Sequence, residues 1–302
     1  MNWFTFLPPA VMLALCTVLG RVPLRLHPSW SARLLATTGA MTAVAALGTG
    51  VFVVINYAAT LAPAAAARLP EWALFADDRP VPDAVGIAAG ALSAAGALLA
   101  GRTVARWVRE LRAARADARE PLDTDVPIAV AVPGRRGGVV VSRGLLRDLS
   151  PGELHVVFQH EASHLRHRHH RYLAAGALAA AMLPPLRALD GRLRLAVERW
   201  ADEDAAEATG DRAFVARTLA KVALAQPRPP GAAEAEAEAT AFAESGVVER
   251  VEALLGTPPA KNAVTGPLLF MGNGVVSGSL TAATLQLDHI IASSLLPLLA
   301  LR

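Results

Sequence analysis

Three long, uncharged runs of apolar residues dominate the first third of the chain: Phe4 to Gly20, Leu34 to Ala67 and Ala84 to Gly101. A helix needs about 17 to 25 apolar residues to cross a bilayer, and each run reaches that length. A fourth apolar stretch, Pro267 to Leu301, is long enough for one span or for two short ones. The pattern therefore predicts a mainly α-helical integral membrane protein.

The composition agrees with a surface that contacts lipid. Hydrophobic residues make up 53% of the 302 residues, the mean hydropathy is +0.37, and only 18% of the residues are charged, whereas soluble domains average about 25%. Cys16 is the only cysteine, which excludes a disulfide framework and a cysteine metal site. The first run lacks a basic start and a small-residue cleavage site, so we interpret it as a retained anchor rather than a signal peptide.

The placement of arginine predicts an orientation. Three arginines and no acidic residue lie at 21–33, and six arginines follow the third run at 102–119, whereas the loop at 68–82 mixes two arginines with three acidic residues. Cytoplasmic loops carry the excess of positive charge. We therefore expect a multi-pass protein of the plasma membrane whose amino terminus is outside and whose sequence after the third run is cytoplasmic.

One short motif in this cytoplasmic part carries candidate chemistry. Residues 160–164 read His-Glu-Ala-Ser-His. On a helix, residues four apart share a face, so His160 and His164 reach one metal ion while Glu161 lies beside it as a general base. A catalytic zinc site needs three protein ligands and an open position. The alternative is a solvated basic stretch, because histidines and arginines fill 166–171.

A third ligand is expected on a second helix. Glu198 and Asp202 are four residues apart, and Glu198 follows His164 by 34 positions. We expect Glu198 to complete the zinc site and Asp202 to accept a hydrogen bond from a ligand histidine, which fixes its tautomer. Alone, such a pair of acids is typical of a solvated helix face.

These segments carry a family resemblance. Leu149–Leu154, His160–His164 and Glu198–Asp202 together resemble the BlaR/MecR-type integral-membrane peptidases, which are sensor-transducers for beta-lactams, and more distantly the HtpX and CAAX prenyl endopeptidases; the resemblance covers roughly 120–256. It implies a gluzincin site with two histidine ligands, a glutamate ligand and a glutamate base. It also implies a BlaI-like winged-helix repressor as substrate. We expect no penicillin-binding sensor domain, because the chain ends just after the last apolar run.

The resemblance extends in part to Arg250. The sequence Glu249-Arg250-Val251 is similar to a segment that places an arginine near the site in HtpX-like proteins. Those proteins have a histidine six residues earlier, where this chain has Glu244. We interpret Arg250 as a residue that braces the fold.

A β-hairpin is expected between the membrane and the motif. Val126–Val132 and Gly138–Ser142 are short β-rich runs on either side of a loop that contains proline and glycine. In zincins an edge strand binds the substrate backbone by strand addition. We assign this role to Val139, Val140, Val141 and Ser142; a purely structural hairpin is the alternative.

The ligand helices impose a limit on topology. The apolar segment from Tyr172 is too short for an ordinary crossing and is broken at Pro184-Pro185. A full crossing would carry Glu198 to the opposite side of the membrane from His160, and one metal ion cannot be shared across a bilayer. We expect a re-entrant or membrane-packed hairpin near 172–189; the alternative is a cytosolic hairpin.

The predicted organisation is three transmembrane helices at 1–101, a cytosolic zincin domain with a small β-hairpin at 102–256, and a carboxyl-terminal transmembrane segment at 257–302. The predicted function is zinc-dependent hydrolysis of peptide bonds in a cytosolic or membrane protein, with the lipid bilayer as a second partner and no direct binding of nucleic acid. The alternatives are a general quality-control protease and a signalling or scaffold protein whose zinc site is structural.

Overall fold

The computed structural model describes residues 6–66, 80–117, 121–134, 137–225 and 246–284. Within these ranges the chain is mainly helical with one small antiparallel sheet, as the sequence predicts. The end of the fourth apolar run, beyond residue 284, lies outside the described residues, as do the Arg135-Arg136 pair, most of the loop expected at 68–82 and all of residues 226–245.

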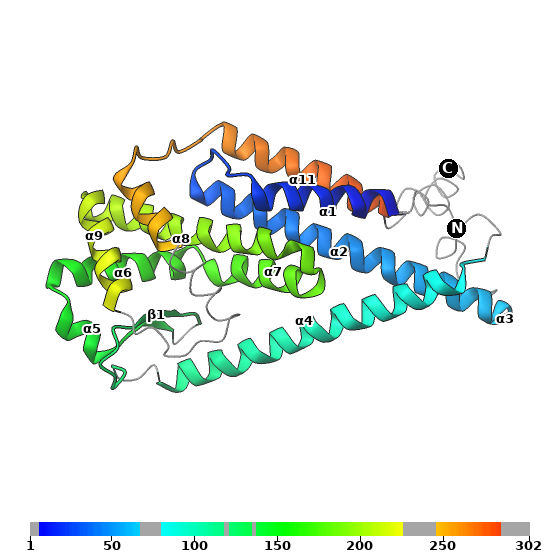
Figure 1. The fold of residues 1–302 in the computed structure, drawn as a ribbon, viewed down its shortest axis with the longest axis horizontal. Helices are drawn as coiled ribbons and strands as arrows, with labels where there is room; N and C mark the ends of the chain where they lie inside the picture. The colour runs from blue at the N-terminus through cyan, green and yellow to red at the C-terminus, as the bar shows by residue number, and fades with distance from the viewer. Residues whose placement is uncertain (1–5, 67–79, 118–120, 135–136, 226–245, 285–302) are drawn as a thin grey trace, which may run out of the picture.

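Long helices form a bundle that runs along the molecule (Figure 1). The bundle helices are α1 (Leu7–Arg21), α2 (Pro28–Leu61), α4 (Asp83–Asp117), α7 (His169–Met182), α8 (Arg187–Thr209) and α11 (Thr265–Thr284), and the short α3 (Pro63–Ala66) follows α2. Helix α2 packs against α1, α4, α7, α8 and α11. The main core lies on its buried side, where Leu35 packs with Leu189, Leu193 and Trp200 of α8.

Two of the described helices are long and apolar enough to cross a membrane, by length and composition alone: Pro28–Leu61 and Asp83–Ala113. The buried core helix of a soluble protein meets the same test, and α1 is apolar but has only 15 residues. The two long helices differ in burial, because 39% of the apolar window of α2 is buried but only 11% of that of α4. Most of the apolar surface of α4 therefore has no protein partner within the described part of the chain.

The elements between α4 and α7, together with α9 and the helix after it, gather at one end of the bundle (Figure 1). They are β1 (Ala129–Val132), β2 (Gly138–Val141), α5 (Arg143–Asp148), α6 (Pro151–Arg166), α9 (Arg212–Ala225) and a helix at 246–255. The two strands pair in antiparallel register, from Ala129 opposite Val141 to Val132 opposite Gly138. The predicted hairpin is therefore present, with strands slightly shorter than the β-rich runs.

The residues that precede and begin α6 form the helix cap that their types favour. Ser150 caps the helix, Pro151 occupies its first position, and Glu153 completes a capping box by accepting from the backbone N–H of Ser150 at 2.7 Å. Lys221 of α9 also binds the Glu153 carboxylate at 2.9 Å. These contacts fix where α6 begins, and therefore which of its residues face the bundle.

Helices α7 and α8 form a helical hairpin. The turn is the 3-10 helix η3 (Pro184–Leu186), where the prolines interrupt the helix, and α8 then returns beside α7 toward the end that holds the sheet (Figure 1). Gly176 permits this close packing, because a Cβ atom there would lie 2.6 Å from both Asp190 and Leu193. The link from α1 to α2 lies at the same end as the sheet, and α2 ends at the opposite end (Figure 1).

Candidate metal centre

Helix α6 and the returning helix α8 bring together three side chains that could hold a metal ion. His160 and His164 lie one turn apart on α6, and their Nε2 atoms are 3.1 Å apart. Glu198 of α8 approaches both, with its Oε2 at 3.4 Å from Nε2 of His160 and its Oε1 at 3.6 Å from Nε2 of His164. Among the described residues these three form the one group with this geometry. The geometry is what the sequence predicts for the ligands of one metal ion.

The separations fit a tetrahedral zinc ion. Zinc binds nitrogen and oxygen ligands at about 2.0 to 2.2 Å, so the ligands of a regular tetrahedron are about 3.3 to 3.6 Å apart. The three measured separations, from 3.1 to 3.6 Å, lie in or close to this range. Two imidazole nitrogens and one carboxylate oxygen are also a usual zinc ligand set. The side chains therefore suit a zinc ion in both spacing and chemistry.

Asp202 and Arg250 contact His160 and Glu198. Oδ1 of Asp202 lies 3.0 Å from Nδ1 of His160, a hydrogen-bond distance with an angle outside the ideal range. Arg250, from the helix at 246–255, donates two 2.8 Å hydrogen bonds to the Asp202 carboxylate. Its third nitrogen lies 3.2 Å from Glu198. Arg250 therefore holds both carboxylates and is part of the site, which goes beyond its interpretation as a brace for the fold.

This arrangement concentrates negative charge where a cation is expected. Burial alone would raise the pKa values of Glu198 and Asp202, but His160 lowers that of Glu198 and Arg250 lowers that of Asp202, so both stay ionised. Burial alone would lower the pKa of His160, but the two carboxylates raise it to about 10. Positive charge at this point, from a proton or a metal ion, is therefore stabilised by both acids.

Glu161 faces the same space without belonging to the group of three. Two cavities of about 250 Å³ each are lined by His160, Glu161 and Glu198. Burial raises the pKa of Glu161, while the His160 charge and a hydrogen bond with the backbone of Ala131 act in the opposite direction. A carboxylate with a raised pKa beside an open space suits a general base.

His169 is a member of the site that sequence reasoning missed. The chain turns sharply after α6 at Arg168, whose φ of 55° is left-handed, and α7 then begins at His169. This turn brings Nδ1 of His169 to 3.0 Å from Nδ1 of His164. Burial and the neighbouring His164 lower the pKa of His169 to about 3, so its ring is neutral. The basic stretch after the motif is thus only partly a solvated one.

His167 also has a structural partner. Its Nε2 lies 2.8 Å from Oδ2 of Asp204, which also accepts a 2.7 Å hydrogen bond from the hydroxyl of Ser163. The ring of His167 contacts that of Trp200, with centroids 4.4 Å apart and the planes tilted by 30°. These contacts join α6 to α8 just beyond His160, His164 and Glu198, and they help to fix the separation of the two helices.

The strand next to the metal-binding group is β1. Ala129, Val130 and Ala131 line the cavity at His160 and His164, and none of Val139–Ser142 does. Ser142 is fully buried, and its hydroxyl donates to Val126 O and accepts from the N–H groups of Ile128 and Leu145. Its side chain is therefore committed to the fold. A substrate-binding role for Val139–Ser142 stays a prediction that this geometry does not favour.

The comparisons with known proteins agree with a peptidase. The family model described as Peptidase family M48 matches residues 104–189, which is less than a third of the chain. This segment includes the strands and both histidines of the motif but ends before Glu198 and Arg250. The match supports a metallopeptidase similar to the HtpX and CAAX group, and it does not single out the BlaR/MecR type. No curated protein and no solved structure matches the chain.

Proposed function

We propose that the protein is a zinc metalloendopeptidase in which His160, His164 and Glu198 hold the metal ion. The observation that carries this proposal is the convergence of three ligand atoms at separations of 3.1 to 3.6 Å beside Glu161 and an open cavity. Structural zinc sites are closed by four protein ligands, and catalytic sites have three with an open position. The group has three members among the described residues, which favours catalysis over a structural role.

The chain's own residues supply the proton transfers. Zinc, when bound, acts as a Lewis acid and lowers the pKa of water. Glu161 accepts a proton from the attacking water on its carboxylate and delivers it to the nitrogen of the leaving amine. Asp202 and Arg250 keep His160 and Glu198 oriented during these steps. Glu161 is thus the catalytic residue, and Asp202 and Arg250 are positioning residues.

We propose that the edge of β1 that faces away from β2 binds the substrate backbone. Ser142 donates to the carbonyl of Ile128, so Ile128 turns its backbone groups toward β2. Alternate residues of a strand face opposite edges, and Ala129 and Ala131 therefore face away from β2, on the side of the cavity that holds Glu161. The outer edge of β2 is covered near its end, because Leu122 donates to Val141 O. Strand addition is thus favoured at β1.

We propose that the bundle lies in the plasma membrane, with the metal centre cytoplasmic and the amino terminus outside. The exposed apolar side chains of α4 support this, for example Ile87 at 62% and Leu92 at 74% exposure, because such a surface is costly in water. The arginine asymmetry supports the orientation. Single cysteines at Leu61 and Asp123 in a Cys16→Ser background test it: an impermeant maleimide should label intact cells at 61 and spare 123, and the reverse would overturn the orientation.

The substrate we propose is a cytosolic or membrane protein, with a BlaI-like winged-helix repressor as the specific candidate. The support for the repressor is the sequence resemblance to BlaR/MecR-type peptidases alone. A purified BlaI-like protein, incubated with the zinc-loaded chain, should be cut at one position. Failure to cut it while other proteins are cleaved would favour a general protease of membrane proteins.

The proposed activity is tested by Glu161→Gln. The amide is nearly isosteric with the carboxylate but cannot take up a proton, so the variant should bind as much zinc as the parent and lose peptide hydrolysis by about 100-fold or more. Zinc is measured by mass spectrometry of the purified proteins and hydrolysis with casein. An exposed control, Glu207→Gln, lies on α8 away from the metal group and should behave as the parent. Full activity in Glu161→Gln would rule out the proposed mechanism.

A further inference from the structure

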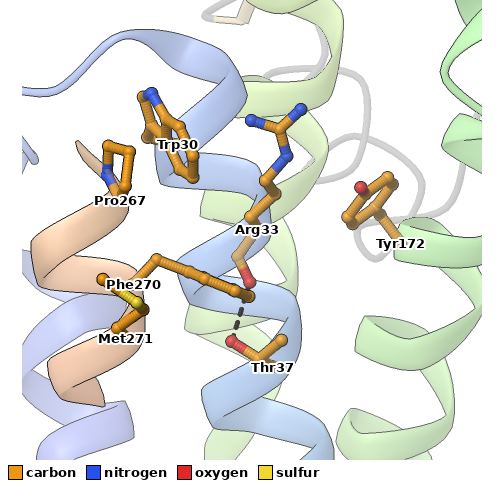
Figure 2. Close-up of a pocket in the computed structure, with 7 residues that line it drawn as sticks. All are labelled: Trp30, Arg33, Thr37, Tyr172, Pro267, Phe270 and Met271. Atoms are coloured by element: carbon orange, nitrogen blue, oxygen red, sulfur yellow. Dashed lines mark hydrogen bonds between the residues drawn. The ribbon is translucent and has the colours of Figure 1, made fainter. Parts of the chain in front are cut away.

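A further cavity lies apart from the metal centre, between α2, α7 and α11 (Figure 2). Its volume is about 440 Å³. It is lined by Trp30, Arg33, Thr37, Tyr172, Pro267, Phe270 and Met271. None of the proposed metal ligands or their supporting residues belongs to this set. The lining is aromatic and apolar except for the hydroxyls of Thr37 and Tyr172 and one charge, that of Arg33.

Arg33 is held as a cation without an acidic partner. Its guanidinium carbon lies 4.6 Å from the centre of the Trp30 ring and 4.8 Å from that of Trp200, so the two indoles fix its position. In the described part of the chain, no carboxylate lies within ion-pair distance of it. A half-buried arginine that is positioned but not neutralised is suited to bind an anion from outside.

Helix geometry adds to this preference for an anion. Trp30 is the third residue of α2, Pro267 is the third residue of α11, and Tyr172 is the fourth residue of α7. Three helices therefore begin around the cavity, and the amino-terminal end of each carries partial positive charge. The close approach of α11 depends on Gly266, where a Cβ atom would lie 2.4 Å from the Trp30 ring.

The other side of the cavity is continuous with an exposed apolar surface. Phe270 packs against Trp30 at a centroid distance of 6.2 Å, and Met271 beside it is 58% exposed. Leu268 and Leu269 on the same helix are also exposed, at 58% and 51%. Tryptophan, tyrosine and arginine at the end of a candidate span are typical of the level of lipid headgroups. The ligand expected here has an anionic head and an apolar tail.

We propose that this cavity binds an anionic phospholipid. The phosphate lies against Arg33, and one acyl chain follows Phe270 and Met271 along α11. The proposal rests on the membrane placement given above but not on peptidase activity. Extraction of membranes with alkaline carbonate tests the placement separately: a protein released by carbonate would refute the membrane placement, whereas the lipid experiment compares variants of a purified chain.

The experiment is native mass spectrometry of the full chain in detergent, with phosphatidylglycerol, with phosphatidylcholine of the same acyl chains, or with inorganic phosphate. The parent should retain phosphatidylglycerol in preference to phosphatidylcholine. Arg33→Gln should bind phosphatidylglycerol about tenfold more weakly, the usual scale for loss of a charge-assisted hydrogen bond. The matched control is Arg21→Gln, at the exposed end of α1, which should bind as the parent does.

Three results would overturn the proposal: equal retention of both lipids by the parent, unchanged retention of phosphatidylglycerol by a folded Arg33→Gln, or binding of inorganic phosphate as tight as that of the lipid. The third would assign the site to free phosphate. If Arg33→Gln does not fold, Met271→Ser keeps the test open, because this exposed side chain contributes to the acyl contact alone. It should reduce retention of phosphatidylglycerol severalfold, and retention equal to that of the parent would contradict the proposal.

Discussion

Arg250→Met should destabilise the zinc-free protein strongly. The arginine makes two 2.8 Å hydrogen bonds to Asp202 and lies 3.2 Å from Glu198, and the Asp202 side chain is only 2% exposed. Methionine fills a similar volume but removes the cation that makes both hydrogen bonds to the buried Asp202 carboxylate, which then has only His160 beside it. Breaking a buried ion pair by removing one partner costs about 3 to 5 kcal/mol.

This cost corresponds to a large change in Tm. For a protein of this size each kcal/mol shifts Tm by about 2 to 4 °C, so Arg250→Met should melt roughly 10 °C below the parent. Zinc supplies positive charge beside the same two carboxylates, so zinc should raise the Tm of the variant more than that of the parent. The assay is thermal unfolding followed by circular dichroism in detergent, with and without zinc, at one scan rate.

The matched control is Arg192→Met. Arg192 lies 3.5 Å from Glu249, which precedes Arg250 on the same helix, but this pair is partly exposed, at 29% and 46%. An exposed ion pair contributes about 0 to 1 kcal/mol, so the Tm should change by at most a few degrees. If Arg250→Met melts within 2 °C of the parent, the charge balance inferred for the site is wrong.

Three further predictions concern the ligands, their support and the start of α6. Glu198→Ala should lose most of the bound zinc, whereas Asp202→Ala should weaken zinc affinity about 10- to 100-fold; the opposite order in a zinc titration would mean that Asp202 is the ligand. His169→Gln, which removes the ring beside Nδ1 of His164, should also lower zinc affinity about 10-fold, while His155→Gln, on the exposed face of α6, should leave it unchanged. Lys221 and Ser150 lower the pKa of Glu153 to about 2, so the stability that its ionised carboxylate adds to the fold is complete above pH 4.5 and is lost as the pH falls toward 2. The Tm of Glu153→Gln should therefore be slightly lower than that of the parent at pH 7 and equal to it near pH 2. A Tm difference that persists near pH 2 would contradict this prediction.

Local periodicity was sufficient to predict which side chains of α6 and α8 lie close together. His160 and His164 share a helix face because they are four residues apart, and the capping signals at Ser150 set the start of their helix. Glu198 was predicted from its position after the motif, and the structure places it between the two histidines. Each of these inferences needs only the geometry of one helix, or the requirement that two helices share one ion.

The remaining parts of the candidate site, His169, Arg250 and β1, depend on tertiary contacts that sequence periodicity does not specify. His169 reaches His164 because Arg168 adopts a left-handed conformation, which is uncommon outside glycine and has no clear signal at this position. Arg250 reaches Asp202 across 48 positions of sequence. The choice between β1 and β2 depended on which strand lines the cavity at His160, and alternation of residues within a hairpin is the same for both strands.

The central claim is that this site hydrolyses peptide bonds with Glu161 as the base. Its most direct test is digestion of casein by the zinc-loaded full chain in water enriched in oxygen-18, followed by mass spectrometry of the fragments. The parent should produce fragments whose new carboxyl groups carry one heavy oxygen atom, and chelation of zinc or the change Glu161→Gln should abolish them. A folded, zinc-loaded parent that yields no such fragments, or the same yield from Glu161→Gln, would contradict the account.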